Sequence, residues 1–183
     1  MKYCVFFRNL NLGRPNCPSR TQLEGAFLKA GATAAASFLT NGTLVFSTPA
    51  GKSAARILSR AQELLRQECG LKEPAFLREL THLATLADSE PFKGVELHGV
   101  YDCFVTFLDR KVVFPKNAVL KTPRGEVEVV FRTATEAFCL SRKITQSPGS
   151  PNAFLEKLLQ QPATTRAWNT VLRLLKKHGN PPP

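Results

Sequence analysis

The chain of 183 residues is long enough for one large domain or two small ones, and its 43% apolar share excludes a wholly disordered protein. Its formal net charge of +11 is divided evenly, since residues 1–80 carry +6 and residues 81–183 carry +5, so attraction to nucleic acid or phosphate would come from the folded surface. No apolar run approaches the ~20 residues of a membrane-spanning helix, and the first residues lack the long apolar region of a secretory signal. We therefore expect a cytoplasmic protein with no membrane partner.

Cysteine and histidine spacing does not indicate a metal or disulfide framework. The five cysteines are an odd number, lie far apart and include no C-x-x-C pair. The three histidines are equally scattered. We predict structural thiols, no metal site and no cofactor.

Residues 1–80 predict the order β-α-β-β-α-β. An apolar strand over 3–10 precedes a helix that opens at Ser19 with Gln22 at the capping-box position and stops at Gly31. Strands over 34–39 and 43–48 flank the turn Thr-Asn-Gly at 40–42. A helix from 52 to 69 ends at Gly70, and a short strand follows over 73–80. This order is that of the ferredoxin-like unit.

Residues 81–183 predict a related order. A short helix over 81–89 leads to a strand over 101–108, a short helix over 116–120 and a hairpin with strands over 126–133 and 136–143. One further helix runs from Ser150-Pro151 to Gln161, with proline at its first position, and the last from about Thr165 to His178. We therefore predict an α+β fold of two ferredoxin-like halves, 1–80 and 81–183, produced by internal duplication and packed as one compact unit.

Residues 5–10, VFFRNL, come within one position of the first strand motif of RNA-recognition modules, which share the order β-α-β-β-α-β. The second motif of such modules places aromatic rings at alternating strand positions, where bases stack. NGTLVFST has Thr43 and Val45 at those positions. Both alternating sets of YCVFF are apolar, which favours a strand covered on both faces. The RNA-recognition interpretation is therefore the less favoured one.

Four motifs follow one another along the chain: YCVFFRNLNLG, FLTNGTLVF, FVTFL and TTRAWNTVLRLLKKHG. In this order they resemble the motifs of the bacterial domain of unknown function 1697 family. The positions that correspond to the family motifs are Arg8, Asn11, Gly13, Gly42, Val45, Phe46, Thr165, Arg166, Trp168, Asn169, Thr170 and Val171. Asn9, Arg14 and Ala167 depart from the family motifs, where a shared polar site would lie. The resemblance implies an α+β fold of two ferredoxin-like halves and brings no known reaction.

No motif of a catalytic centre or phosphate-binding loop occurs in the chain. Glu126 and Glu128 alternate along one strand face, and a solvated edge explains them as well as an acid/base pair does. We predict no catalytic residue.

Polar residues at strand and helix ends form the candidate ligand-binding set. Thr165 and Arg166, at the expected start of the last helix, are predicted to hold an anion with backbone N–H groups and a guanidinium. Arg142 and Lys143 follow the last expected strand and would reach the same place. Arg8 and Asn11 lie at the tip of the first strand, although Asn11 and Asn41 would also serve as turn residues. The family motif adds Asn169.

Three functions fit these observations. The favoured hypothesis is a non-catalytic protein that binds an anionic ligand, a nucleotide or a phosphate-bearing molecule, in a cleft between the halves where Arg8, Asn11 and Arg166 converge. The second is a nucleic-acid-binding protein that acts through its basic surface. The third is an enzyme of undetermined class.

Overall fold

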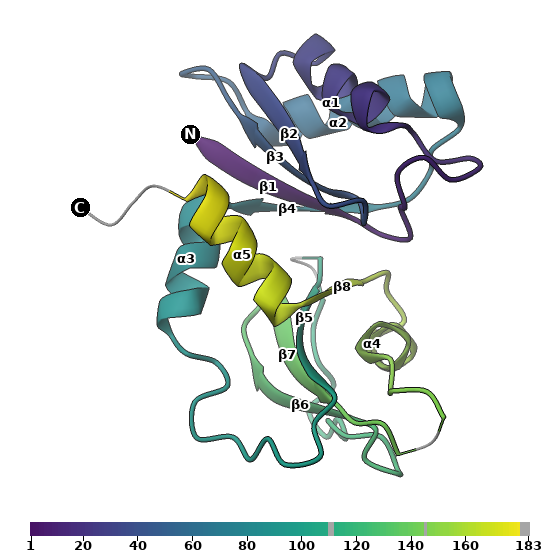
Figure 1. The fold of residues 1–183 in the computed structure, drawn as a ribbon, viewed down its shortest axis with the longest axis vertical. Helices are drawn as coiled ribbons and strands as arrows, with labels where there is room; N and C mark the ends of the chain where they lie inside the picture. Colours follow the sequence, from purple (N-terminus) through teal and green to yellow (C-terminus); the bar gives the residue numbers. More distant parts are fainter. Residues whose placement is uncertain (110–111, 145, 180–183) are drawn as a thin grey trace. The chain divides into compact units, whose positions relative to one another are not determined.

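The computed structural model describes residues 1–109, 112–144 and 146–179, and these form two compact units (Figure 1). The first unit comprises Met1–Ala84 with His178 and Gly179, and the second comprises Thr85–Lys177. Each unit holds a four-stranded antiparallel sheet. The chain is therefore an α+β protein, as the sequence predicts. The division into halves between residues 80 and 81 stays a prediction.

The first unit contains the strand and helix order predicted for it. The elements are β1 Lys2–Phe7, α1 Arg20–Lys29, β2 Ala34–Phe38, β3 Thr43–Ser47, α2 Ala54–Cys69 and β4 Ala75–Glu79, and α3 Leu80–Asp88 follows directly. The strands are arranged in the order β2-β3-β1-β4. The capping box of Ser19 and Gln22 is present at the start of α1, and Gly70 ends α2 in the left-handed conformation at φ +71°.

Helices α1 and α2 cover one face of this sheet, and their buried residues form a core with Val5, Phe7, Leu44 and Phe46. The Phe27 ring of α1 packs against Phe46 at 5.0 Å between ring centroids. On the opposite face of β1, Cys4 and Phe6 are buried as well. The burial of both alternating sets confirms that β1 is covered on both faces.

The edge strand β2 is bonded to side chains of α1. The backbone N–H of Ser37 donates to Glu24 Oε1 at 2.7 Å, and Arg20 Nη1 donates to the Ser37 carbonyl at 3.2 Å. Arg20 Nη2 also donates to the carbonyl of Leu39 at 3.4 Å. Two charged side chains of α1 therefore occupy backbone groups that an edge strand otherwise presents outward.

The second unit has a sheet of order β6-β7-β5-β8. Its elements are β5 Asp102–Phe107, β6 Val127–Arg132, β7 Glu136–Ser141, α4 Pro151–Leu159, β8 Thr164–Ala167 and α5 Trp168–His178. Helix α4 begins as predicted, with Ser150 as its N-cap and Pro151 in its first turn. It ends two residues before the expected Gln161, because Gln160 adopts a left-handed conformation at φ +52°.

Two predicted helical segments are wrong. Residues 116 and 117 form a turn and residues 118–120 no regular element, and the Leu120 carbonyl accepts a hydrogen bond from Val129 N of β6 at 2.7 Å. Thr164–Ala167 is not the first turn of the last helix but strand β8, in which Thr165 pairs with Thr106 of β5. In both places pairing with a distant strand decides the conformation.

None of the described helices is long and apolar enough to cross a membrane.

Candidate ligand-binding pocket

The structure brings three of the predicted site residues to one end of the first sheet. The segment after β1 lies beside the turn between β2 and β3, since Phe7 N donates to the Gly42 carbonyl and Leu12 N to the Thr40 carbonyl, both at 2.8 Å. Arg8, Asn11 and Asn41 belong to these two neighbouring segments.

The polar groups of these residues have partners in the first unit. Arg8 Nη1 lies 3.1 Å from Glu73 Oε2 in a partly exposed ion pair. Asn41 Oδ1 accepts a hydrogen bond from Thr43 Oγ1 at 2.9 Å, and the Asn11 carbonyl accepts one from Arg14 N at 3.2 Å. These hydrogen bonds are of the kind expected if the two asparagines serve as turn residues. Their ligand-binding role stays a prediction.

The other predicted site residues lie in the second unit. Thr165 and Arg166 are in β8, so the helix start expected at these residues is wrong, and their anion-binding role stays a prediction. Arg166 is buried, and its Nη1 donates to Thr164 Oγ1 and to the Thr165 carbonyl, both at 2.8 Å. Asn169 is exposed on α5.

Arg142 and Lys143 follow β7 directly. Arg142 Nη1 lies 3.0 Å from Glu128 Oε2, and its backbone N donates to the Glu126 carbonyl at 2.7 Å. Lys143 is exposed. These two residues lie next to a pocket that the sequence did not indicate.

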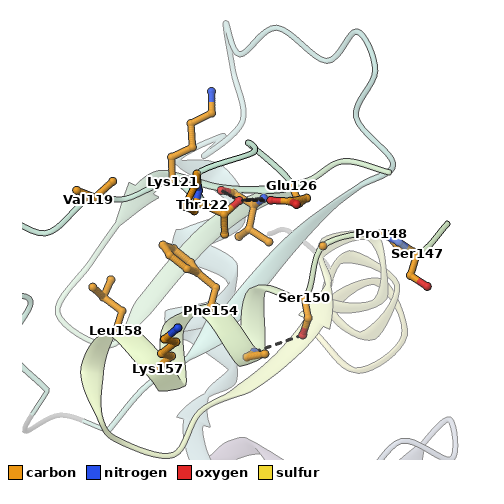
Figure 2. A pocket seen from close by; sticks show the side chains of 14 residues that line it. Val119, Lys121, Thr122, Glu126, Ser147, Pro148, Ser150, Phe154, Lys157 and Leu158 are labelled. Carbon is orange, nitrogen blue, oxygen red and sulfur yellow. Dashed lines mark hydrogen bonds between the residues drawn. The ribbon is translucent and has the colours of Figure 1, made fainter. Parts of the chain in front are cut away.

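The pocket lies between α4 and the segment that precedes and begins β6, and its volume is about 890 Å³ (Figure 2). One wall comes from residues 119–127. The other wall comes from residues 147–158, which include the N-cap Ser150 and the first turns of α4. We call this the α4 pocket.

One end of the α4 pocket combines apolar side chains with a lysine. Figure 2 shows Val119, Phe154 and Leu158 gathered there, with Lys157 beside Leu158. Phe154 and Leu158 also pack against the core of the second unit, which fixes this wall. Lys121 lines the pocket too, but its ammonium points outward in Figure 2 and lies 3.6 Å from Glu128 Oε2.

Toward the other end, Figure 2 shows Glu126, Ser147 and Ser150. Thr122 Oγ1 donates to Glu126 Oε2 at 2.7 Å, and this hydrogen bond is the largest of the effects that lower the pKa of Glu126. Ser150 Oγ accepts from Ala153 N at 3.3 Å and caps α4. This end therefore presents hydroxyls and an ionised carboxylate.

Gly149 lets the two walls approach each other. A Cβ atom at this position would lie 2.5 Å from the Glu126 carbonyl oxygen, which is closer than any side chain tolerates. The Gly149 carbonyl accepts from Ser141 Oγ at 2.7 Å, and its N–H donates to the Arg142 carbonyl at 3.2 Å. The absence of a side chain at Gly149 is therefore needed for the shape of the pocket.

Sequence reasoning missed Phe154, Lys121 and Lys157 as site residues. The stretch Ser-Pro-Gly-Ser-Pro at 147–151, directly before a capped helix, was the available signal, because such a tight connection brings a helix start close to the preceding strand. No group of three His, Cys, Asp or Glu side chains suited to a metal ion occurs among the residues that the structure describes.

A comparison with protein families matches residues 1–138 to "Protein of unknown function (DUF1697)". The chain belongs to the DUF1697 family. The match covers the first unit and the second as far as Phe138 in β7, so it includes the motifs at Arg8 and Gly42 and ends before α4 and the motif at Thr165–Val171. Comparisons with curated proteins and with solved structures gave no match. The description of the family names no activity, and the α4 pocket is formed partly by residues beyond the matched region.

Proposed function

We propose that the chain is a non-catalytic binding protein for a small ligand that carries an anionic group, such as a phosphate, on an apolar body. The observation that carries the proposal is the α4 pocket, with Phe154 and Leu158 in its wall and Lys157 at the same end. Its volume of about 890 Å³ lies within the range of ~300–1,000 Å³ usual for ligand pockets.

The apolar wall would supply most of the affinity. Each 100 Å² of apolar ligand surface removed from water contributes about 2.5 kcal/mol. Lys157 is exposed, so its attraction for an anion is reduced by solvent and amounts to roughly 0.2–1 kcal/mol. The apolar body therefore provides binding strength, and the lysine provides preference for an anion.

Three probes separate these contributions in isothermal titration calorimetry: 1-naphthyl phosphate, 1-naphthol and inorganic phosphate. We expect 1-naphthyl phosphate to bind more tightly than either of the others, because it alone uses both the apolar wall and the lysine. Equal affinity for 1-naphthyl phosphate and 1-naphthol would show that no anion is recognised. If none of the three binds, the proposal fails.

Variants place the probe in the pocket. We expect Lys157→Met to weaken 1-naphthyl phosphate about two- to fivefold and to leave 1-naphthol unchanged. Lys121→Met should have a smaller effect, because the Lys121 ammonium already lies near Glu128. Lys116→Met is the matched control, since Lys116 is an exposed lysine of the same unit outside the pocket. An equal loss in the control would mean that only net charge matters.

We further propose that the two units derive from duplication of a ferredoxin-like unit. The strand orders β2-β3-β1-β4 and β6-β7-β5-β8 correspond element by element, although no helix between β5 and β6 is present among the described residues. The correspondence extends past the sheets. The last strand of each unit, β4 or β8, lies at an edge of its sheet and carries one buried arginine, Arg78 or Arg166, and a helix follows directly.

Nucleic-acid binding is the second candidate, and the exposed face of α5 favours it. Arg173 and Lys176 are exposed there, and Trp168–His178 contains no acidic residue. Binding of an oligonucleotide through this face would weaken steeply with salt, and Arg173→Gln with Lys176→Gln would reduce the slope of log K against log salt by about two. An unchanged slope would exclude α5 as the contact.

A further inference from the structure

Glu126 directly precedes β6 and Glu128 lies in it, yet the surroundings of the two carboxylates differ. Glu128 Oε2 lies 3.0 Å from Arg142 Nη1 and 3.6 Å from Lys121 Nζ, so two cations compensate its charge. The Glu126 carboxylate instead accepts a hydrogen bond from the hydroxyl of Thr122. Within the part of the chain that the structure describes, Glu126 has no ion pair. Of the two carboxylates, only Glu126 lines the α4 pocket.

The Glu126 carboxylate is ionised at neutral pH. The Thr122 hydroxyl, the backbone N–H of Glu126 itself and, to a smaller extent, the charge of Arg124 lower its pKa. The hydrogen bond also restricts how the side chain is directed, since one carboxylate oxygen is held at 2.7 Å from Thr122 Oγ1. The pocket therefore contains a fixed anion in a chain whose net charge is +11.

The α4 pocket has charges of opposite sign toward its two ends. Lys157 lies with Leu158 and Phe154, and Glu126 lies toward Ser147 and Ser150 (Figure 2). An anionic ligand that reached the Glu126 end would be repelled there. A ligand group that is cationic and donates hydrogen bonds would instead complement the carboxylate and the serine hydroxyls.

We infer that the ligand of the α4 pocket is zwitterionic, with an ammonium group directed toward Glu126 and an anionic group toward Lys157, separated by an apolar body that packs against Phe154. This inference rests on the proposed function and narrows the class of its ligand. It assigns Glu126 as the residue that selects the ammonium group.

Two probes of the same shape test the inference. Tyramine O-phosphate has a phosphate, an aromatic ring and an ammonium group, and 4-ethylphenyl phosphate lacks only the ammonium group. We expect tyramine O-phosphate to bind about two- to fivefold more tightly to the unmodified chain, which is the effect of a partly exposed charge pair. Glu126→Gln should abolish that difference and leave the affinity for 4-ethylphenyl phosphate unchanged or slightly higher.

Glu96→Gln is the matched control, because Glu96 is an exposed carboxylate of the same unit outside the pocket. Thr122→Val is the second variant, and it should reduce the preference for tyramine O-phosphate by releasing the Glu126 side chain. If both phosphates bind equally, or if the preference survives Glu126→Gln, the inference is overturned while the proposed function stands. If neither phosphate binds, the proposed function itself is overturned.

Discussion

Arg78 and Arg166 make the same contact in different units. Each lies buried in the last strand of its sheet, β4 or β8, and each donates its Nη1 to the carbonyl of the residue before it at 2.8 Å. The buried residues of the helix that follows also recur at the same sequence separations from the arginine. They are Leu80, Leu83 and Leu86 after Arg78, and Trp168, Val171 and Leu174 after Arg166. For the proposed duplication, this correspondence is stronger support than residue identity, because it joins one buried charge to one helical packing pattern.

Replacing either arginine should destabilise its unit. We expect Arg166→Met and Arg78→Met each to lower the free energy of unfolding by about 1.5–3 kcal/mol, the contribution of hydrogen bonds to a charged group. Arg173→Met on the exposed face of α5 is the control and should change stability by less than about 0.5 kcal/mol. Urea unfolding followed by circular dichroism measures the difference. Equal stability of Arg166→Met and Arg173→Met would contradict a structural role for the buried group.

Gly42 tests the close packing at the end of the first sheet. Its φ is +69°, and a Cβ atom there would lie 2.7 Å from the Leu10 Cβ atom. Gly70 has nearly the same φ of +71°, but a Cβ atom added to it would meet no atom within 4 Å, so Gly70→Ala reports backbone strain alone. We expect Gly42→Ala to cost about 1–3 kcal/mol more than Gly70→Ala in urea unfolding. Similar losses would show that Leu10 moves away without cost.

Gly149→Ala should alter the α4 pocket. Because the added carbon would meet the Glu126 carbonyl oxygen at 2.5 Å, the segment before α4 must move away from β6. We expect a loss of about 1–3 kcal/mol in stability and weaker binding of 1-naphthyl phosphate in calorimetry. Gly25→Ala is the opposite case, since Gly25 lies inside α1 with open space around it. There we expect a gain of about 0.5–1 kcal/mol, with binding unchanged.

The Cys139 thiol should resist alkylation in the folded protein. Burial raises its pKa to about 12, so about one part in ten thousand is thiolate at pH 8. Iodoacetamide should modify the partly exposed Cys17 before Cys139, which peptide mass spectrometry resolves. Stability should also fall as pH rises from about 9 to about 12, because the unfolded chain then releases a proton that folded Cys139 retains. Equal labelling rates for Cys17 and Cys139 would contradict the expected protection.

The side chains of Arg20 and Glu24 should keep the β2 edge from pairing with another chain. Without them, the N–H and carbonyl of Ser37 face solvent at an edge strand. We expect Arg20→Ala with Glu24→Ala to self-associate at concentrations where the unmodified chain does not, as light scattering would detect. Lys29→Ala with Glu68→Ala removes a cation and an anion that lie 2.9 Å apart between α1 and α2 and not at the edge. Association of both double variants to the same extent would point to general destabilisation.

Much of the first unit could be predicted because local signals mark its elements. Ser19 and Gln22 fix the start of α1, and Gly70 fixes the end of α2, through contacts within a few residues. The second unit depends on contacts that a sequence pattern does not reveal. Thr165 is in a strand because β8 pairs with β5, and the carbonyl of Leu120 accepts a hydrogen bond from Val129 of β6 instead of one within a helix.

The same reason explains what the sequence could not show of the candidate site. Glu126 and Glu128 were recognisable as a pair, but their different surroundings depend on where Arg142, Lys121 and Thr122 lie in space. Phe154 and Lys157 read as ordinary positions of an amphipathic helix. Their proximity to Val119 follows only from the packing of α4 beside the segment before β6.

The described residues that line the α4 pocket all fall between Val119 and Leu158, in one stretch of the chain. Because one gene segment encodes these residues, exchange of that segment between relatives would transfer the described lining of the α4 pocket as a whole. The family match stops at residue 138, partway through that stretch. Under the proposed function, we expect a chimera that exchanges residues 119–158 with those of another DUF1697 member to transfer ligand preference as a block.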